Sequence, residues 1–446
     1  MSVRSSSVAP ARACAQAVIA DVCTRAAFAD RALRAHVAGL DQRDRQLAMR
    51  LVYGTVQRQM TLDYLIESFS ERPVSKLDHA VRDVLRMGLY ELCYTDGAPD
   101  RAIVHDAVEL ARDAGSHGHG LVNAILRRGA REGRQLLEKL PDQTADEAAL
   151  AHSHPSWIAR HFFRELGAEQ ARALLGADNQ PAETALRANT LCCQPAALAA
   201  ELPVRCHNDP NLAEALIIDD PFDARSCPQW RTGAFMAQSR ASMLVAHVLD
   251  PRPDERVLDL CAAPGAKSTH LAALMAGRGA VIAVERSPKR AAELAENVRR
   301  MHARSVHVQE AHAATPRAND DLFDRVLVDP PCSGLGTLQN HPDLRWRMNE
   351  QTLHRLAGVQ QAILAAGAQA LRPGGVLVYS TCTISETENE CLIDAFLDRH
   401  PDFHIEQPPP QLQAPLHPTR TSDFVLTLPH RDRTQGFFIA RLRRED

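Results

Sequence analysis

The sequence predicts an α/β protein with an all-helical domain over 1–148, a small α/β connecting domain over 149–233 and a doubly wound parallel-sheet domain over 234–446. Two patterns support this prediction. In the first domain apolar residues recur three or four positions apart, as at Leu47 and Leu51, which is typical of amphipathic helices. In the last domain short β-like runs alternate with long helical runs, which is typical of a parallel sheet covered by helices.

Local signals define the elements of the first two domains. The helical pattern runs from about Pro10 to Lys139 and is interrupted by short connections that contain Gly and Pro. In the connecting domain we expect one helix over 157–175 and two short strands at 184–189 and 215–218, separated by segments rich in Pro and Asp.

The last domain has the clearest alternation of strands and helices. Its predicted helices cover 287–301 and 350–371, and a Pro- and Gln-rich segment at 406–418 is interpreted as a surface loop. The predicted strands are 256–260, 280–285, 306–309, 325–329, 376–380 and, at the end of the chain, 436–442.

Composition limits the class of protein. With 446 residues, of which 45% are hydrophobic and 24% charged, the chain is neither disordered nor fibrous and is long enough for two or three domains. Its formal net charge of −4 argues against a strongly basic nucleic-acid coat but leaves a local RNA-binding patch open. No apolar run reaches the length of a membrane span, and residues 1–12 lack the apolar core of a signal peptide.

Cysteine and arginine usage add two expectations. The 11 cysteines are scattered and include no C-x-x-C pair, so we expect a reduced, cytoplasmic protein without a zinc-ribbon site or other metal. Four arginines gather near the end of the helical domain, where they indicate either a contact with RNA phosphates or a solvated helix end: Arg127, Arg128, Arg131 and Arg134.

The first motif that carries chemistry is the sequence Val-Leu-Asp-Leu-Cys-Ala-Ala-Pro-Gly-Ala-Lys at 257–267. A strand runs into a tight turn of small residues and a helix follows, so backbone N–H groups can approach a ligand at the carboxyl edge of a parallel sheet. Glu285 ends the next strand, where an acidic side chain can hold both hydroxyls of a ribose. The combination favours a nucleoside-containing cofactor over an ordinary strand–turn–helix corner, and the NAD and ATP fingerprints are absent.

An acid and two thiols follow other strands of the same domain. Asp329 and Cys332 come directly after one strand, and Cys382 lies at the end of another. Because the carboxyl ends of parallel strands meet at one edge of a sheet, we expect all three side chains to lie near the nucleoside site. A single buried cysteine is often only a small hydrophobic residue, but two at this edge favour a chemical role.

A thiol, an acid and a nucleoside cofactor fit methyl transfer to carbon 5 of a pyrimidine. Carbon 5 is a poor nucleophile, but a thiolate that adds to carbon 6 creates an enamine that is nucleophilic at carbon 5. An acid near the ring nitrogen N3 stabilises this adduct, and a sulfonium compound supplies the methyl group. Loss of the carbon 5 proton and expulsion of the thiolate then release the product. The target base must leave its stack to enter such a site.

The motifs together resemble the signatures of S-adenosylmethionine-dependent RNA cytosine-C5 methyltransferases: Asp259-Leu-Cys-Ala-Ala-Pro-Gly, Asp329-Pro-Pro-Cys-Ser-Gly and Ser380-Thr-Cys-Thr. Residues 43–56 and 120–128 resemble NusB, a helical RNA-binding fold. A NusB-like domain in front of this methyltransferase is the arrangement of the RsmB/Fmu/Sun family of bacterial 16S rRNA methyltransferases.

The resemblance implies a Rossmann-like methyltransferase domain with S-adenosyl-L-methionine as cofactor. It implies methylation of one cytosine of 16S rRNA, cytosine 967 in rRNA numbering, in RNA that is not yet assembled into a subunit. We also expect a monomer that binds neither DNA nor a membrane. In this family the Thr-Cys thiol is the nucleophile, which would assign the attack to Cys382, product release to Cys332, and a place between cofactor and cytosine to Asp329.

The resemblance also implies a set of cofactor-binding residues, and three of them depart from the usual pattern. Ala266 stands where the family usually has a second glycine, Glu285 replaces the commoner Asp, and His312 falls where an Asp contacts adenine. The implied set is Cys261, Ala262, Ala263, Pro264, Gly265, Ala266, Lys267, Glu285, His312 and Asp329.

Two alternatives stay open at the level of the sequence. The same chemistry can act on another rRNA site or on a tRNA, although the NusB-like domain favours 16S rRNA. The chain can also be a non-catalytic, NusB-like RNA-binding assembly factor with a decayed cofactor site, which Ala266 and His312 motivate. Retention of both thiols and Asp329 argues against decay.

Overall fold

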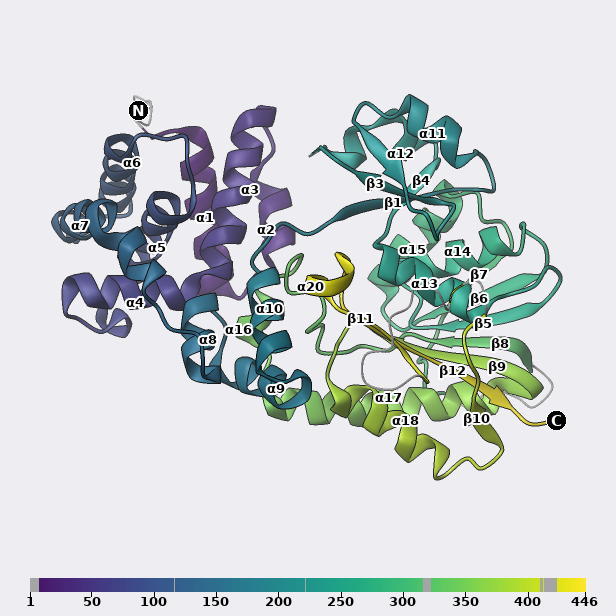
Figure 1. Ribbon diagram of the computed structural model, residues 1–446. Helices are drawn as coiled ribbons and strands as arrows, with labels where there is room; N and C mark the ends of the chain where they lie inside the picture. The colour runs from purple at the N-terminus through teal and green to yellow at the C-terminus, as the bar shows by residue number, and fades with distance from the viewer. Residues whose placement is uncertain (1–7, 116, 221, 316–321, 410–411, 413–422) are drawn as a thin grey trace. The chain divides into compact units, whose positions relative to one another are not determined.

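The computed structural model describes residues 8–115, 117–220, 222–315, 322–409, 412 and 423–446 (Figure 1). The chain divides into two compact units. The first consists of Met1–Gln180 with Leu338–Arg347, and the second consists of Pro181–Thr337 with Met348–Asp446. A short piece from the middle of the C-terminal half therefore belongs to the N-terminal unit.

The first unit contains helices only, among the residues that are described there. Its helices are α1 (Pro10–Arg25), α2 (Ala29–His36), α3 (Gln42–Gln57), α4 (Gln59–Ser70), the 3-10 turn η1 (Val74–Lys76), α5 (His79–Tyr94), α6 (Asp100–Asp113), α7 (His119–Glu138), α8 (Ala145–His152), α9 (Ser156–Leu166), α10 (Ala168–Ala177) and α16 (Leu344–Arg347).

Polar side chains set the helix ends and link the helices inside this unit. The Asp78 carboxylate caps α5 by accepting from the backbone N–H groups of the first turn. The guanidinium of Arg12 on α1 is buried and pairs with Glu91 at 2.6 Å and Asp106 at 2.8 Å, on α5 and α6. Losing one of these carboxylates would leave a buried charge uncompensated, so the pairs favour one arrangement of the three helices.

The inserted piece 338–347 is held by a buried arginine. Arg345 is fully buried, and its guanidinium donates to the backbone carbonyls of Gln57 at 3.3 Å, Ser153 at 3.1 Å and Asp178 at 3.2 Å. Burial lowers the pKa of Arg345 to about 10. Helix ends and turns offer carbonyls without helical partners, and the five-donor guanidinium satisfies three of them at once.

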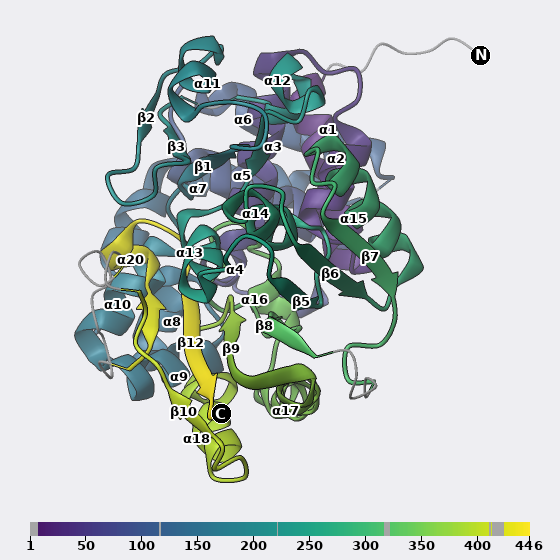
Figure 2. The same cartoon turned by 90° about the vertical axis from the view of Figure 1, so that its right-hand side faces the viewer.

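The second unit begins with a small antiparallel sheet of order β2-β3-β1-β4 (Figure 2). Its strands are β1 (Thr184–Ala188), β2 (Cys206–Asn208), β3 (Ala215–Ile218) and β4 (Phe235–Ala237), accompanied by α11 (Pro195–Glu201), η2 (Ala224–Ser226) and α12 (Pro228–Arg231). The buried side chains of Leu186, Leu216 and Phe235 form its core.

The large sheet has the order β10-β12-β9-β8-β5-β6-β7, with β11 paired to β12. Strands β9, β8, β5, β6 and β7 are parallel, and β12 joins β9 antiparallel. The strands are β5 (Arg256–Leu260), β6 (Ala280–Glu285), β7 (Val306–Glu310), β8 (Phe323–Val328), β9 (Leu371–Thr381), β10 (Phe403–Ile405), β11 (Val425–Thr427) and β12 (Phe437–Arg444). The helices are α13 (Arg240–Leu249), α14 (Ala266–Leu274), α15 (Pro288–Arg300), α17 (Glu350–Ala370), α18 (Glu390–Leu397), α20 (Pro429–Asp432) and the turn η3 (Glu386–Glu388).

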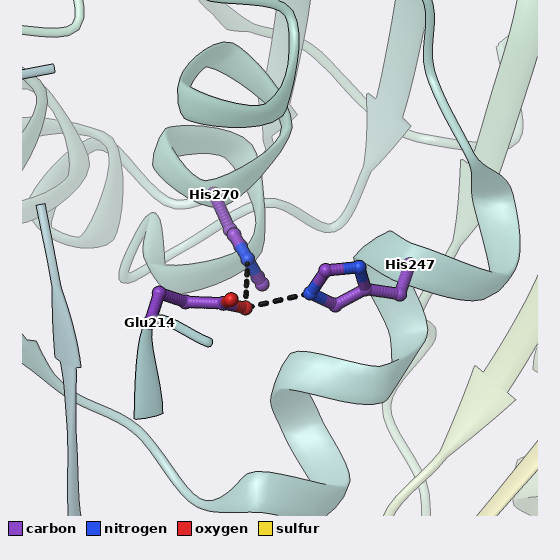
Figure 3. Close-up of side chains that lie close together, drawn as sticks. All are labelled: Glu214, His247 and His270. Carbon is purple, nitrogen blue, oxygen red and sulfur yellow. Dashed lines mark hydrogen bonds and ion pairs between the residues drawn. The ribbon is translucent and has the colours of Figure 1, made fainter. Parts of the chain in front are cut away.

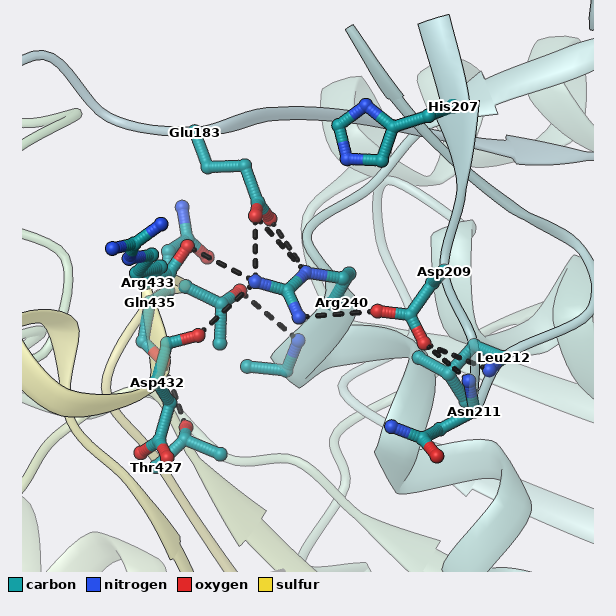
Figure 4. A network of polar contacts seen from close by, with 12 residues as sticks. Glu183, His207, Asp209, Asn211, Leu212, Arg240, Thr427, Asp432, Arg433 and Gln435 are labelled. Carbon is teal, nitrogen blue, oxygen red and sulfur yellow. Dashed lines mark hydrogen bonds and ion pairs between the residues drawn. The ribbon is translucent and has the colours of Figure 1, made fainter. Parts of the chain in front are cut away.

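Arg240 joins the small sheet to the C-terminal hairpin of the second unit (Figure 4). Its guanidinium donates to Glu183 beside β1 at 2.6 Å, to Asp209 after β2 at 3.1 Å and to the backbone carbonyl of Asp432 at 3.0 Å. All five donors of an arginine can be used in this way, and the charge is compensated by two carboxylates. The network fixes the small sheet against the large one.

The predicted α/β class is confirmed, and one helix prediction is wrong. The predicted helix at 157–175 is two helices, because Gly167 takes φ 77° between α9 and α10, a conformation that a continuous helix does not contain. Most of the predicted loop at 406–418 lies outside the described residues. The three-domain division with boundaries at 148 and 233 stays a prediction. No helix in the described part of the chain is long and apolar enough to cross a membrane.

Candidate functional site

The candidate site lies at the carboxyl edge of the parallel strands. The loop after β5 contains Cys261 to Gly265, and α14 begins with Ala266 and Lys267. Glu285 ends β6, Asp329 and Cys332 follow β8, and Cys382 follows β9. Neighbouring strands pair in register, with Leu260 opposite both Val284 and Val328. The sheet therefore brings together residues that are far apart in the sequence, as the parallel pattern predicts.

The two predicted thiols are in contact. The Sγ atoms of Cys332 and Cys382 are 3.3 Å apart, and both side chains are half-buried. The hydrogen bond with Cys382, partial burial and the nearby Cys382 and Glu388 raise the pKa of the Cys332 thiol well above its ordinary value. The raised pKa favours a protonated Cys332, and either thiol can be the donor in the S–H···S contact.

Asp329 is held by two donors at the same edge. Its Oδ2 accepts from the ammonium group of Lys267 at 2.8 Å, and its Oδ1 accepts from the hydroxyl of Ser380 at 3.1 Å. Burial opposes the charge on Lys267, but Asp329 outweighs it and raises the pKa of the lysine. Lys267 also interacts electrostatically with Cys382, so one cation lies close to both an acid and a thiol.

A buried carboxylate that the sequence analysis missed connects the loops of the two thiols. Glu388 is fully buried, and its Oε1 accepts from the backbone N–H of Ser333 at 2.9 Å and from the Gln360 amide at 2.8 Å. Its other oxygen accepts from the Ser333 hydroxyl, which also contacts Thr383 at 2.8 Å. Burial raises the pKa of Glu388, although these hydrogen bonds oppose the shift. Ser333 and Thr383, which follow the two thiols in the sequence, are thereby linked to each other and to the Glu388 side chain.

The loop after β5 makes a turn that excludes side chains at one position. Gly265 takes φ +101°, and a Cβ added there would lie 2.7 Å from the Leu294 side chain. Ala266 is the first residue of α14 and is not among the residues with positive φ. Its methyl group therefore does not strain the turn, and the departure from glycine is accommodated by the helix.

Two further predicted cofactor residues lie at the ends of β6 and β7. Glu285 is buried, accepts from the backbone N–H of Ser287 at 2.9 Å and lies 3.6 Å from the guanidinium of Arg290. His312 is exposed, and its Nδ1 accepts from the backbone N–H of Ala314 at 3.2 Å. A neutral His312 thus carries its proton on Nε2, which makes that atom a donor.

One buried oxygen of this region has no hydrogen-bond partner among the described residues. Asp259 is the residue before the last of β5, and its Oδ2 accepts from the Ser268 hydroxyl at 2.6 Å. Its Oδ1 is buried and has no hydrogen-bond partner. Burial raises the pKa of Asp259 to about 7. A buried polar atom without a partner is uncommon and suits a site that takes a ligand with a donor group.

A separate polar cluster of the second unit is formed by Glu214, His247 and His270 (Figure 3). Their candidate ligand atoms lie within 4.8 Å of one another, so the donor types would suit a metal. The geometry is that of hydrogen bonds, because Oε1 of Glu214 contacts Nε2 of His247 at 2.6 Å and Nε2 of His270 at 2.9 Å. Burial and the nearby Arg187 guanidinium lower the pKa of His270 to about 3. The guanidinium is a cation that already lies close to the cluster.

Comparison with known families decides where the chain belongs. Family models match it over residues 246–443 (16S rRNA methyltransferase RsmB/F), 9–131 (NusB family) and 154–225 (Methyltr_RsmF/B-like, ferredoxin-like domain). The "Probable ribosomal RNA small subunit methyltransferase B" of Synechocystis sp. is 37% identical over 427 residues, which cover 93% of this chain and 94% of the relative. The chain belongs to the 16S rRNA methyltransferase RsmB/F family.

Further relatives agree with this RsmB/F membership. A Bacillus subtilis protein of the same name is 35% identical over 416 residues, covering 91% of this chain and 92% of the relative. The crystal structure of PH0851 has a TM-score of 0.81, 25% identity and full coverage of both chains. NSun6 from Pyrococcus horikoshii, crystallised with SFG, shares the fold at a TM-score of 0.59 and 23% identity, over 66% of this chain and 98% of that one. The predicted resemblance is confirmed, and membership makes the chain an rRNA methyltransferase.

Proposed function

We propose that this RsmB/F protein methylates carbon 5 of one cytosine in 16S rRNA, with Cys382 as the nucleophile. The observation that carries the proposal is the contact between two thiols at the sheet edge, 3.3 Å apart, next to an Asp329–Lys267 ion pair of 2.8 Å. An rRNA methyltransferase that acts only on an exocyclic amine or a ribose hydroxyl has no need of a pair of thiols.

Two observations support different roles for the two thiols. The raised pKa of Cys332 favours its protonated form, and Cys382 interacts electrostatically with the Lys267 ammonium group, which favours a thiolate there. The Cys382 thiolate adds to carbon 6 of the cytosine, and the Asp329 carboxyl group stabilises the adduct at N3. After methylation a water molecule takes the carbon 5 proton, the C5–C6 double bond forms again, and the carbon 6–sulfur bond breaks with its electron pair going to the Cys382 sulfur. The Cys332 S–H then protonates or hydrogen-bonds the departing Cys382 thiolate, which assists product release.

The residues at the first three strand ends fit S-adenosylmethionine. Glu285 offers a buried carboxylate for ribose hydroxyls, and the unpartnered Oδ1 of Asp259 offers an acceptor for an amino group. The turn at Gly265 keeps side chains away from the edge of the sheet. When bound, the sulfonium group of this cofactor supplies the methyl that carbon 5 accepts. His312 would present Nε2–H, a donor, toward the adenine rather than the acceptor that an Asp provides.

The test is transfer of labelled methyl from S-adenosylmethionine to protein-free 16S rRNA by the full chain. We expect label in 5-methylcytosine with the wild type, none with Cys382→Ala, and a covalent protein–RNA adduct that accumulates with Cys332→Ala. Cys391→Ala, an exposed cysteine on α18, is the control and should keep full activity.

Each other outcome points elsewhere. Loss of activity with Cys332→Ala but not with Cys382→Ala would exchange the roles of the thiols. Label in a tRNA or at a different rRNA site would change the substrate. A wild type that binds rRNA but neither binds S-adenosylmethionine nor transfers methyl would favour the assembly-factor function.

A further inference from the structure

A groove with several arginines lies between α6 and α7 of the helical unit, two helices that pack side by side (Figure 1). Its volume is about 520 Å³. The side chains of Arg101 and Arg112 from α6 and of Arg127 and Arg131 from α7 line it, and all four are exposed. The groove thus combines the first half of the predicted arginine cluster with two arginines that lie elsewhere in the sequence.

Two of these arginines have no charge partner within the described chain. Neither Arg101 nor Arg127 forms an ion pair or a hydrogen bond with another described residue. Arg112 pairs with Glu109 at 2.5 Å, and Arg131 lies 3.7 Å from Glu132. The groove therefore keeps free positive charge on a chain whose formal net charge is −4.

The other half of the predicted cluster is used inside the unit. Arg128 pairs with Glu132 at 3.0 Å and stacks over the Phe69 ring, with its guanidinium carbon 5.1 Å from the ring centre. Arg134 donates to the backbone carbonyls of Leu92 and Thr95. These two arginines therefore contact neighbouring helices of the same unit. Only the side of α7 that carries Arg127 and Arg131 stays available for the predicted contact with RNA.

We propose that this groove binds the phosphodiester backbone of single-stranded RNA, with Arg101 and Arg127 as the phosphate contacts. The proposal names the RNA-docking surface of the protein and rests on the proposed function for the identity of the RNA. Guanidinium groups offer paired donors that match phosphate oxygens, and two unpaired arginines from facing helices suit successive phosphates of one strand.

The rest of the lining favours RNA over an acidic peptide. Val104, Val108 and Ala130 provide an apolar floor, and the Asn123 amide offers donors and an acceptor beside it. The lining also includes His105 and two carboxylates, Asp100 and Glu109, of which Glu109 pairs with Arg112. An unstacked base can pack on this apolar surface while its edge forms hydrogen bonds with the amide. The carboxylate side chains of an acidic peptide would gain nothing from an apolar surface. The volume is in the range that accommodates a nucleotide-sized group.

The test is the affinity of the full chain for a fluorescein-labelled single-stranded RNA taken from the 16S sequence, measured by anisotropy over a series of salt concentrations. Arg101→Gln with Arg127→Gln should weaken binding on the order of tenfold. The slope of log K against log salt should become shallower by about 1.4, because two phosphate contacts on a single strand are lost. In methyl transfer, KM for 16S rRNA should rise by a similar factor while kcat at saturating RNA stays unchanged.

The matched control removes two exposed arginines from α3, Arg43→Gln with Arg50→Gln, which lie outside the groove. Unchanged binding by the groove variant, or an equal loss in the control, would overturn the proposal. Binding of a labelled polyglutamate peptide that depends on Arg101 and Arg127, without RNA binding, would overturn it in favour of a protein partner. If the wild type binds RNA but transfers no methyl, and the groove variant loses the RNA binding, the proposed function is wrong and the proposed RNA-binding groove is supported.

Discussion

The second unit contains two clusters of buried carboxylates with polar partners, and they differ in what they leave accessible. In the cluster of Glu214, His247 and His270, one carboxylate oxygen accepts from two imidazoles. Burial opposes the charge of Glu214, but the two hydrogen bonds outweigh it and lower the pKa of that carboxyl group. Around Glu388, the carboxylate is equally satisfied, but the groups that it holds end in two half-buried thiols.

The difference shows that buried polarity alone does not indicate a reactive site. Both clusters tie together segments far apart in the sequence, and both carry strongly shifted pKa values. Of the two, the thiol cluster lies at the carboxyl edge of the parallel strands and contains the thiols to which the proposed function gives the chemistry. The imidazole cluster links the segment before β3 to α13 and α14 and uses its donors within the protein (Figure 3). The first should control activity and the second stability.

Among residues other than the two thiols, the largest effect is expected at Lys267. Lys267→Met removes the donor to Asp329 and the cation near Cys382, so kcat for methyl transfer should fall roughly 10³-fold. The matched control is Lys289→Met, an exposed lysine on α15 that should retain activity. Unfolding measured by circular dichroism should be unchanged in both. An active Lys267→Met protein would show that methyl transfer does not need the Lys267–Asp329 ion pair.

A smaller loss of activity is expected at Glu388. Glu388→Gln keeps the size of the side chain but replaces one acceptor by a donor. The new NH2 group either faces the two donors Ser333 N–H and Gln360 amide, or reverses the hydrogen bond with the Ser333 hydroxyl. The loop of Cys332 should shift, and we expect kcat to fall roughly 10–100-fold. Because Glu388 helps to raise the pKa of Cys332, the pH dependence of kcat should also change in this variant. Neighbouring Glu386→Gln is the control, and equal losses in both would remove the positioning role.

The smallest effect on activity, and a clear effect on stability, is expected at His270. Its folded-state pKa of about 3 lies below the ordinary value of 6.5, so unfolding takes up a proton between these two values. The stabilisation is complete above pH 6.5 and is lost as the pH falls toward 3. His270→Gln should flatten this dependence of the unfolding free energy by roughly 2–4 kcal/mol, with methyl transfer at neutral pH within twofold of wild type. A steep acid dependence that survives in the variant would assign it to other groups.

The sequence predicted the strand ends and missed the side chains that support them. Cys332, Cys382 and Asp329 could be placed at one edge because parallel strands align their carboxyl ends. Glu388 lies in a short turn, and its partners Ser333 and Gln360 are far away in the sequence, so no periodicity indicates that the three meet. The break at Gly167 was missed for a related reason, since a glycine within an apolar helical pattern is often tolerated.

The arginine cluster on α7 shows the same limit on the surface. Spacing along the sequence grouped four arginines, but the helix directs Arg127 and Arg131 into the groove and Arg128 and Arg134 toward partners elsewhere. The structure adds Arg101 and Arg112 from another helix. Charge counts along a chain identify a region, whereas the face of the helix decides which charges are available to a ligand.

The piece at Leu338–Arg347 has a consequence for how the protein is made. Because the helical unit includes this piece, the unit cannot complete its structure when residue 180 has been synthesised. The backbone carbonyls of Gln57, Ser153 and Asp178 can form their hydrogen bonds with Arg345 only after more than a hundred further residues have been synthesised. Synthesis of the strands β1 to β8 falls in between. The N-terminal unit of the chain is thus finished only after half of the strands of the large sheet, β5 to β8, have been synthesised, and a fragment ending at residue 180 lacks the last helix of the unit, α16.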